Sequence, residues 1–258
     1  MRDRFTQIGF SRRIKLEWLQ LTAQLVTERN DTETIRSVLN TALREKLFGG
    51  SETPRGSIEK TVSILLQTWA NVPRELALLR DTGIELLQEI PSGEHLPIHW
   101  GMSMAAYPFF ASVAAVVGRL FKLQGTATAA QVQRRLREQY GERETVSRSV
   151  RHVLRTFFDW QVLGSGGSEG LYISSGFRAV ARPEVVAWMI EAFLHANPQG
   201  GHPLKEVLLS PCFFPFRLDR DPGKLRMAQS GRIEVIRQGG LADDMVMLSR
   251  PSTKYLDK

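Results

Sequence analysis

The chain has 258 residues, of which 42% are hydrophobic and 24% are charged. This composition is ordinary for a globular protein, and the length is sufficient for two or three small domains. The formal net charge of +7 and the pI of about 9.8 favour a polyanionic partner, although a positive balance alone does not require one.

Cysteine usage and hydropathy exclude several classes of protein. Cys212 is the only cysteine, which excludes an internal disulfide and a cysteine-rich metal site. The most apolar run, Met104 to Val117, is shorter than the roughly 20 residues that a membrane helix needs. The first residues lack the apolar core of a signal peptide. We therefore expect a cytoplasmic protein without a membrane segment and without a cofactor.

Apolar residues recur at helical spacing throughout residues 1–90, which predicts an N-terminal bundle of helices. Asp31 is expected to cap the second helix of this bundle, and Thr82-Gly83 is expected to interrupt the last one. The beginning of the chain is basic, which indicates either a solvated helix entry or an arm that follows a DNA backbone. The basic residues are Arg2, Arg4, Arg12, Arg13 and Lys15.

Residues 91–110 combine prolines with aromatic residues, and this composition predicts a linker whose rings pin the bundle to the next domain. His95 and His99 are four residues apart, but Pro97 between them is expected to break any helix. A metal pair here would lack a third ligand nearby, so we expect no metal site.

Residues 111–176 predict a winged-helix domain, in which three helices precede a two-stranded hairpin. Thr128 and Gln131 form a capping-box pattern at the start of the second helix. The third helix is expected to begin near Thr145, and the loop from Gly164 to Gly170 is the expected wing. The predicted fold class is therefore mainly α, with a helical bundle followed by a winged helix.

Arginines give this domain its expected function. Arg148, Arg151 and Arg155 are three and four residues apart, so they are expected to share one exposed helical face. Such a helix can enter the major groove of duplex DNA, where its side chains reach base edges and phosphates. The predicted DNA-binding residues are Arg134, Arg135, Arg137, Arg143, Ser147, Arg148, Arg151 and Arg155. The wing has no Lys or Arg, which favours the alternative of a module that docks onto an acidic protein.

Residues 177–258 repeat the order of helices and hairpin in a degraded form, which predicts an α+β domain that resembles a second winged helix. A short strand is expected within residues 212–216, and Asp221-Pro222 can start a third helix. The alternating residues 232–237 are expected to pair with residues 245–248. This domain is expected to pack or dock rather than to bind DNA, because its third helix would carry few cations.

Catalytic motifs are absent from the sequence. It contains no phosphate-binding Gly-rich loop followed by Lys-Ser/Thr, no His-Glu-x-x-His pattern and no nucleophile elbow. His152 lies beside the arginines of the third helix and is interpreted as a phosphate contact or as a simply exposed side chain. We therefore expect a protein that is not an enzyme.

Two stretches resemble a known family. These are LREKLFGGSETPRGSIEKTVSILLQTW (residues 43–69) and AYPFFASVAAVVGRLF (residues 106–121), which leads into the winged segment. The layout of a helical N-terminal domain joined to a winged helix resembles the BrxA proteins of BREX bacteriophage-defence systems. That resemblance implies a cytoplasmic, non-enzymatic DNA-binding accessory protein that works beside other defence-system proteins. A transcriptional repressor that binds a palindromic operator as a dimer is a further alternative.

Overall fold

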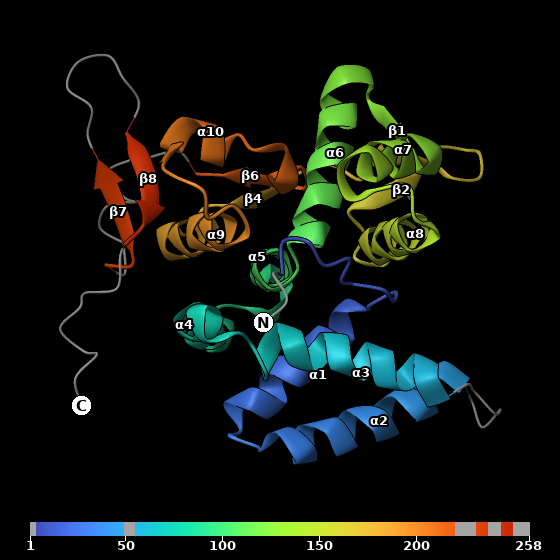
Figure 1. The fold of residues 1–258 in the computed structure, drawn as a ribbon. Helices are drawn as coiled ribbons and strands as arrows, with labels where there is room; N and C mark the ends of the chain where they lie inside the picture. The colour runs from blue at the N-terminus through green and yellow to red at the C-terminus, as the bar shows by residue number, and fades with distance from the viewer. Residues whose placement is uncertain (1–3, 49–54, 220–230, 237–243, 250–258) are drawn as a thin grey trace.

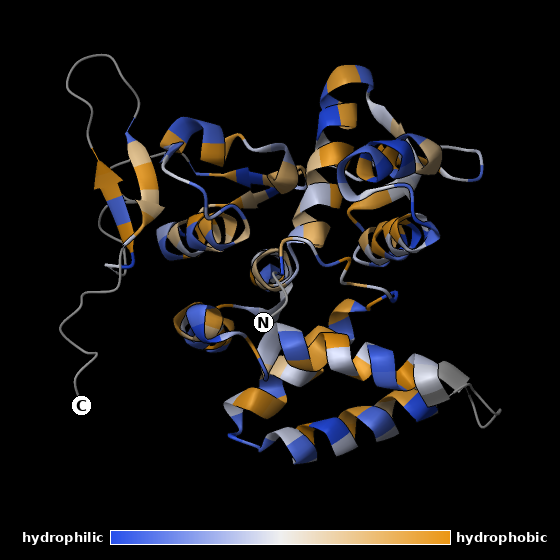
Figure 2. Ribbon diagram, viewed as in Figure 1, coloured by the Kyte–Doolittle hydropathy of each residue, from blue (hydrophilic) through white to orange (hydrophobic). Residues whose placement is uncertain are grey.

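The computed structural model describes residues 4–48, 55–219, 231–236 and 244–249, and over these residues the protein is mainly helical. Helices from the first third of the chain form the lower part of the molecule in Figure 1, and two further groups of elements lie side by side above them. Hydrophilic residues lie on the outward faces of helices such as α2 and α8 (Figure 2). One continuous cluster of buried apolar side chains runs through all three groups.

The N-terminal group is a helical bundle. Its elements are α1 (Leu16–Thr27), α2 (Thr32–Phe48), α3 (Arg55–Trp69), the 3-10 helix η1 (Arg74–Leu76) and α4 (Ala77–Glu89). Asp31 caps α2 as predicted, because its carboxylate accepts the backbone N–H of Thr34 at 2.8 Å. The predicted interruption at Thr82-Gly83 is wrong, since α4 continues through both residues. A Cβ at Gly83 would lie 2.9 Å from the Trp188 side chain, so this glycine permits close packing rather than a break.

The predicted linker contains the central helix of the molecule. After the 3-10 helix η2 (Ser92–Glu94), α5 (Leu96–Ala106) buries every residue from Leu96 to Ala105. The prediction that Pro97 breaks a helix is wrong, because Pro97 lies in the first turn, where its missing N–H has no intrahelical partner to lose. Residues 91–110 therefore include a core helix rather than an extended connection.

Two buried histidines of this region share one partner. The side-chain oxygen Oε1 of Gln20 lies 2.8 Å from His95 Nδ1 and 2.9 Å from His99 Nε2. His95 Nε2 lies 3.0 Å from the carbonyl oxygen of Ile90, which can only accept, so Nε2 is the donor of that bond. Because an amide oxygen accepts, Gln20 Oε1 accepts the N–H of His99 Nε2, and one side chain thus connects the two rings.

The second group contains three helices and a small sheet. Its elements are α6 (Pro108–Gln124), β1 (Thr126–Thr128), α7 (Ala129–Tyr140), α8 (Glu144–Asp159), β2 (Leu163–Ser165) and β3 (Leu171–Ser174). The strands are antiparallel in the order β1-β3-β2, and β1 is a strand that the sequence did not predict. The predicted capping box is present, since Thr128 Oγ1 accepts from Gln131 N at 3.1 Å and Gln131 Oε1 accepts from Thr128 N at 2.9 Å.

Within the described ranges, no single helix is long and apolar enough to cross a membrane. By length and composition, α5 and α6 pass that test only as a pair, and the pair is bent by 118°. Most of the residues of both helices are buried inside the protein.

The third group mixes short helices and strands. Its elements are β4 (Arg178–Val180), α9 (Pro183–Ala196), β5 (His202–Pro203), α10 (Leu204–Leu208), the 3-10 helix η3 (Pro211–Phe213), β6 (Phe216–Leu218), β7 (Ile233–Ile236) and β8 (Met245–Leu248). The predicted pairing of the last two strands is confirmed. Of the strand predicted within residues 212–216, residues 212–213 belong to η3 and residues 214–215 form a turn, while Phe216 begins β6, which pairs in parallel with β4. The third helix predicted from Asp221 lies outside the described residues.

Tryptophan indoles join the three groups. The Nε1–H of Trp100 in α5 donates to the carbonyl oxygen of Cys212 at 3.1 Å, and that of Trp188 in α9 donates to Leu79 at 2.9 Å. The Trp100 ring also stacks on Phe157 of α8 at 4.7 Å between centroids. The central helix is thus bonded to η3 and stacked on α8, which fixes both relative to the bundle.

Acid is expected to destabilise the protein through its buried histidines. Burial, with a smaller contribution from His95, lowers the pKa of His99 from 6.5 to about 3. The unfolded chain binds a proton at His99 below about pH 6.5 and the folded chain does not until about pH 3, so protonation favours unfolding in this interval. This histidine alone should remove about 3 kcal/mol from the free energy of unfolding by about pH 4.

Urea denaturation at several pH values measures this effect. A His99→Gln variant should be less stable than wild type near neutral pH, and its stability should depend less on pH between about 6.5 and 4. His202→Gln, at a partly exposed position, is the control and should keep the wild-type pH dependence. Equal pH dependence in His99→Gln and wild type would contradict the assignment.

A close backbone approach between α6 and η3 should make Gly118 irreplaceable. A Cβ at this position would lie 2.0 Å from the carbonyl oxygen of Pro211, so Gly118→Ala should lower the free energy of unfolding by about 2 kcal/mol. Gly56→Ala is the matched control, because a Cβ there would meet nothing within 4 Å. Thermal melting should show a lower Tm for the first variant alone.

Candidate functional site

Helix α8 places the three predicted arginines on one exposed face. Arg148, Arg151 and Arg155 are all exposed, and the opposite side of the helix packs into the core. The buried residues of α8 are Val146, Ser147, Ser149, Val150, Val153, Leu154, Thr156 and Phe157. The predicted shared face of the arginines is therefore present, and the aromatic core beneath it holds the helix in place.

The basic segment near the N-terminus lies against α8. The backbone N–H of Ile14 donates to Thr156 Oγ1 at 2.9 Å, and Trp160 Nε1 donates to the carbonyl oxygen of Ile14 at 3.0 Å. Arg13 forms a bidentate ion pair with Asp159. The segment is thus anchored to the end of α8, and whether it also follows a DNA backbone stays a prediction.

This anchoring brings Arg12 to the arginines of α8. The side chain of His152 is half-buried, and its Nδ1 atom has no hydrogen-bond partner among the described residues. Burial lowers the pKa of His152 from 6.5 to about 4, with further contributions from the positive charges of Arg12, Arg155, Arg151 and Arg148. The imidazole is therefore neutral at physiological pH and sits in a field that attracts anions. We call Arg12, Arg148, Arg151 and Arg155 the arginine face.

A nearby carboxylate partly neutralises the positive charge of the arginine face. Arg151 lies 3.0 Å from Glu144 in an exposed ion pair, whereas no ion pair of Arg148 or Arg155 is found among the described residues. Exposed pairs of this kind contribute little to stability and separate readily, so Arg151 remains available to a competing anion. The members of the arginine face without such a pair are the stronger candidates for phosphate contacts.

The predicted arginines of α7 are more dispersed. Arg134 and Arg135 are exposed, and Arg135 approaches Glu138 at 3.5 Å. Arg137 is partly buried and approaches Glu142 at 3.3 Å, while Arg143 donates to the carbonyl oxygen of Tyr140 at 2.9 Å. These side chains can add positive charge beside α8, but among the described residues no hydrogen bond or ion pair joins them to the arginine face.

One residue of the predicted site differs from expectation. Ser147 is only 6% exposed and lies on the inner side of α8 between Val146 and Val150, so its prediction as a DNA contact is wrong. The loop between β2 and β3 is exposed and, as the sequence shows, carries no cation. Burial raises the pKa of Tyr172 in β3, and the positive charge of Arg155 opposes this rise.

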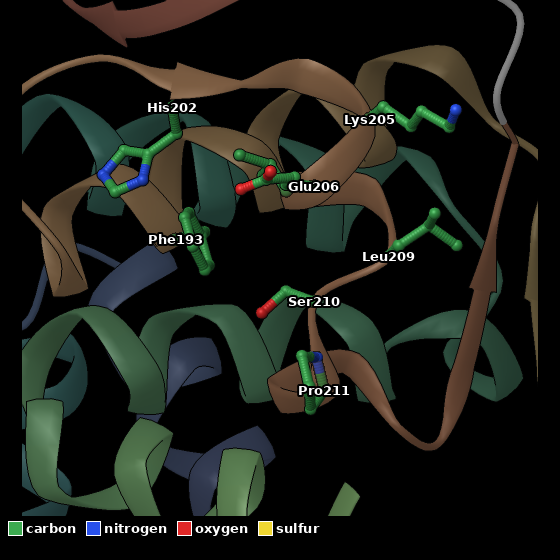
Figure 3. A pocket seen from close by; sticks show the side chains of 8 residues that line it. Phe193, His202, Lys205, Glu206, Leu209, Ser210 and Pro211 are labelled. Carbon is green, nitrogen blue, oxygen red and sulfur yellow. The ribbon is translucent and has the colours of Figure 1, made fainter. Parts of the chain in front are cut away.

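A separate groove of 540 Å³ lies between α9 and α10, with Phe193 at its centre (Figure 3). His202 contacts the carbonyl oxygen of Asn197 at 3.0 Å, and the Ser210 hydroxyl lies 3.2 Å from the sulfur of Cys212. Burial raises the pKa of the Cys212 thiol to about 12, so the thiol is protonated at neutral pH. In the part of the chain that the structure describes, His202 and Ser210 form no nucleophile–base pair, and no cluster of metal ligands occurs.

Comparison of the chain with protein-family models, with curated proteins and with solved structures found no match. The geometry and charge of the arginine face therefore remain the best indication of function.

Removing Arg12 should raise the pKa of His152. The Arg12 guanidinium disfavours a second positive charge beside it, so Arg12→Gln should shift the midpoint of the imidazole titration above about 4. NMR spectroscopy of labelled histidine measures this midpoint. Arg44→Gln, on α2 in the N-terminal bundle, removes one exposed cation elsewhere and should leave the midpoint unchanged. An unchanged midpoint in Arg12→Gln would show that Arg12 does not face His152.

Proposed function

We propose that this protein is a non-enzymatic binder of double-stranded DNA that uses residues 108–174 as a winged helix. The observation that carries the proposal is the arginine face, in which three turns of one rigid helix and a distant segment present four guanidinium groups together. Guanidinium groups make bidentate hydrogen bonds to phosphate and to guanine, which suits them to this ligand.

The order of the elements supports the winged-helix interpretation. Three helices are interleaved with the strands as α6-β1-α7-α8-β2-β3, the sheet has the order β1-β3-β2, and α8 contacts β2 of the hairpin. In this arrangement α8 is the recognition helix and the loop between β2 and β3 is the wing. An α-helix fits the major groove of B-DNA, which is about 12 Å wide.

The positions of the cations suggest separate roles. Arg148, Arg151 and Arg155 would reach base edges or phosphates from within the groove, while Arg12 would contact the backbone of one strand. Arg134, Arg135 and Arg143 would hold flanking phosphates through their net charge. The wing, which lacks cations, would contribute only backbone N–H groups and serine hydroxyls.

One observation favours a second function, the docking of an acidic protein. Glu144, Glu138 and Glu142 are interspersed among the arginines, and such alternation of charge is common at protein–protein contacts. The wider role of an accessory component in bacteriophage defence, beside other defence-system proteins, is proposed from the resemblance to BrxA proteins alone.

Charge reversal on the arginine face tests the proposal. Arg148→Glu/Arg155→Glu should lower the affinity for a random-sequence duplex at least roughly tenfold, because two cations that release counterions are replaced by anions. Fluorescence anisotropy at several salt concentrations measures the affinity. The slope of log affinity against log salt should fall by about 0.9 for each phosphate that the variant no longer neutralises.

A matched control separates the local effect from net charge. Arg44→Glu/Lys60→Glu reverses two exposed cations of α2 and α3 and so changes the formal charge of the protein by the same amount. This variant should bind nearly as tightly as wild type. If both double variants lose affinity equally, DNA attraction is diffuse and the docking function becomes the better proposal.

A further inference from the structure

The exposed stripe of α8 does not end with its arginines. Phe158 follows Arg155 at the helical spacing of the row, so Arg148, Arg151, Arg155 and Phe158 lie along one side of the helix. Its ring is 46% exposed, whereas Phe157 beside it is fully buried. The apolar residue is therefore part of the same outer surface as the arginine face.

A second exposed ring lies beyond the end of α8. Gln161 connects the end of α8 with Arg178. Its backbone N–H donates to the carbonyl oxygen of Phe158 at 3.0 Å, and its carbonyl oxygen accepts from Arg178 Nη2 at 3.1 Å. Phe177 precedes Arg178 and is 58% exposed, and the guanidinium carbon of Arg217 lies 4.5 Å from the centroid of its ring. We call Phe158, Phe177, Arg178 and Arg217 the aromatic strip.

The chemistry of the aromatic strip fits unpaired bases. Single exposed apolar side chains are common on proteins, but here the ring of Phe177 lies against the Arg217 guanidinium and Phe158 continues the row of arginines on α8. Proteins that bind single-stranded nucleic acid combine cations along the backbone with aromatic rings on which bases stack. A duplex offers no free base face to such rings, because its bases are stacked on each other.

The length of α8 separates most of the arginine face from the aromatic strip. From Arg148 to Phe158 the helix advances about 15 Å along its axis, so Phe158 lies near the opposite end of α8 from Arg148. A recognition helix contacts base edges mainly through its N-terminal residues, so Phe158 and the chain that continues to Phe177 lie at the end of α8 that leaves the groove. A strand that leaves the duplex there would meet the rings.

We propose that the aromatic strip binds an unpaired strand that continues from the duplex on the arginine face, so that the preferred ligand is a duplex with a single-stranded extension. This inference rests on the proposed function for the duplex part. The strip supplies ring surfaces for the bases, and Arg178 and Arg217 supply charge for the phosphates.

The test compares three labelled DNA probes by fluorescence anisotropy at fixed salt. They are a blunt duplex, the same duplex with a single-stranded extension of about ten nucleotides at either end of one strand, and the extension alone. Wild type should bind one extended duplex roughly tenfold more tightly than the blunt duplex, because stacking of a base on a protein ring contributes that order of affinity. The single strand alone should bind more weakly than the extended duplex.

Variants of the rings separate stacking from general apolarity. Phe158→Ala and Phe177→Ala should each reduce the preference for the extended duplex and leave affinity for the blunt duplex unchanged. Phe177→Tyr should keep the preference, while Phe177→Leu, which retains an apolar side chain without a ring, should lose it. Both positions are exposed, so the thermal melting of these variants should match that of wild type.

The outcomes distinguish the two proposals. Equal affinity of wild type for blunt and extended duplexes would overturn the aromatic strip while leaving duplex binding intact. A wild-type preference that survives in both alanine variants would also overturn it. If the blunt duplex fails to bind but the single strand binds in a ring-dependent way, the strip is supported and the duplex function fails. If no probe binds, both proposals fail.

Discussion

The stacking of Trp100 on Phe157 is the contact on which the arrangement of the molecule depends. Trp100 comes from the central helix α5 and Phe157 from the inner side of α8, and their ring centroids are 4.7 Å apart. The same indole donates to the backbone of η3, so one side chain connects three groups of elements. An aromatic pair of this kind contributes beyond its buried area, and here it fixes the side of α8 that remains outside.

Local patterns in the sequence predicted much of this fold, because helical periods and caps involve residues close together in the chain. The capping box at Thr128, the cap at Asp31 and the outer face of α8 are examples. The central helix was missed for a physical reason. It is buried on all sides and has no polar stripe, and its proline, which sits in the first turn, was taken as a break.

Only the part of the candidate site that is built from residues close together in the sequence could be predicted. Spacing alone placed Arg148, Arg151 and Arg155 together, but it could not place Arg12, which reaches them through contacts across more than a hundred residues. Burial decided the remaining differences. Ser147 is polar but lies on the buried side of α8, and Phe158 is apolar but is 46% exposed, so residue type alone does not give the exposure of either side chain.

The bonds between Ile14 and the end of α8 also bear on how the chain is assembled. The arm is made first during synthesis, but its partners Thr156 and Trp160 follow only after more than half of the chain has been translated. Contacts of such long sequence separation form late and slowly. The complete arginine face therefore cannot form until the chain has been translated past Trp160. An isolated fragment of residues 111–176 would carry α8 without Arg12. It would also lack Trp100, so the face of Phe157 on which that indole stacks would be uncovered.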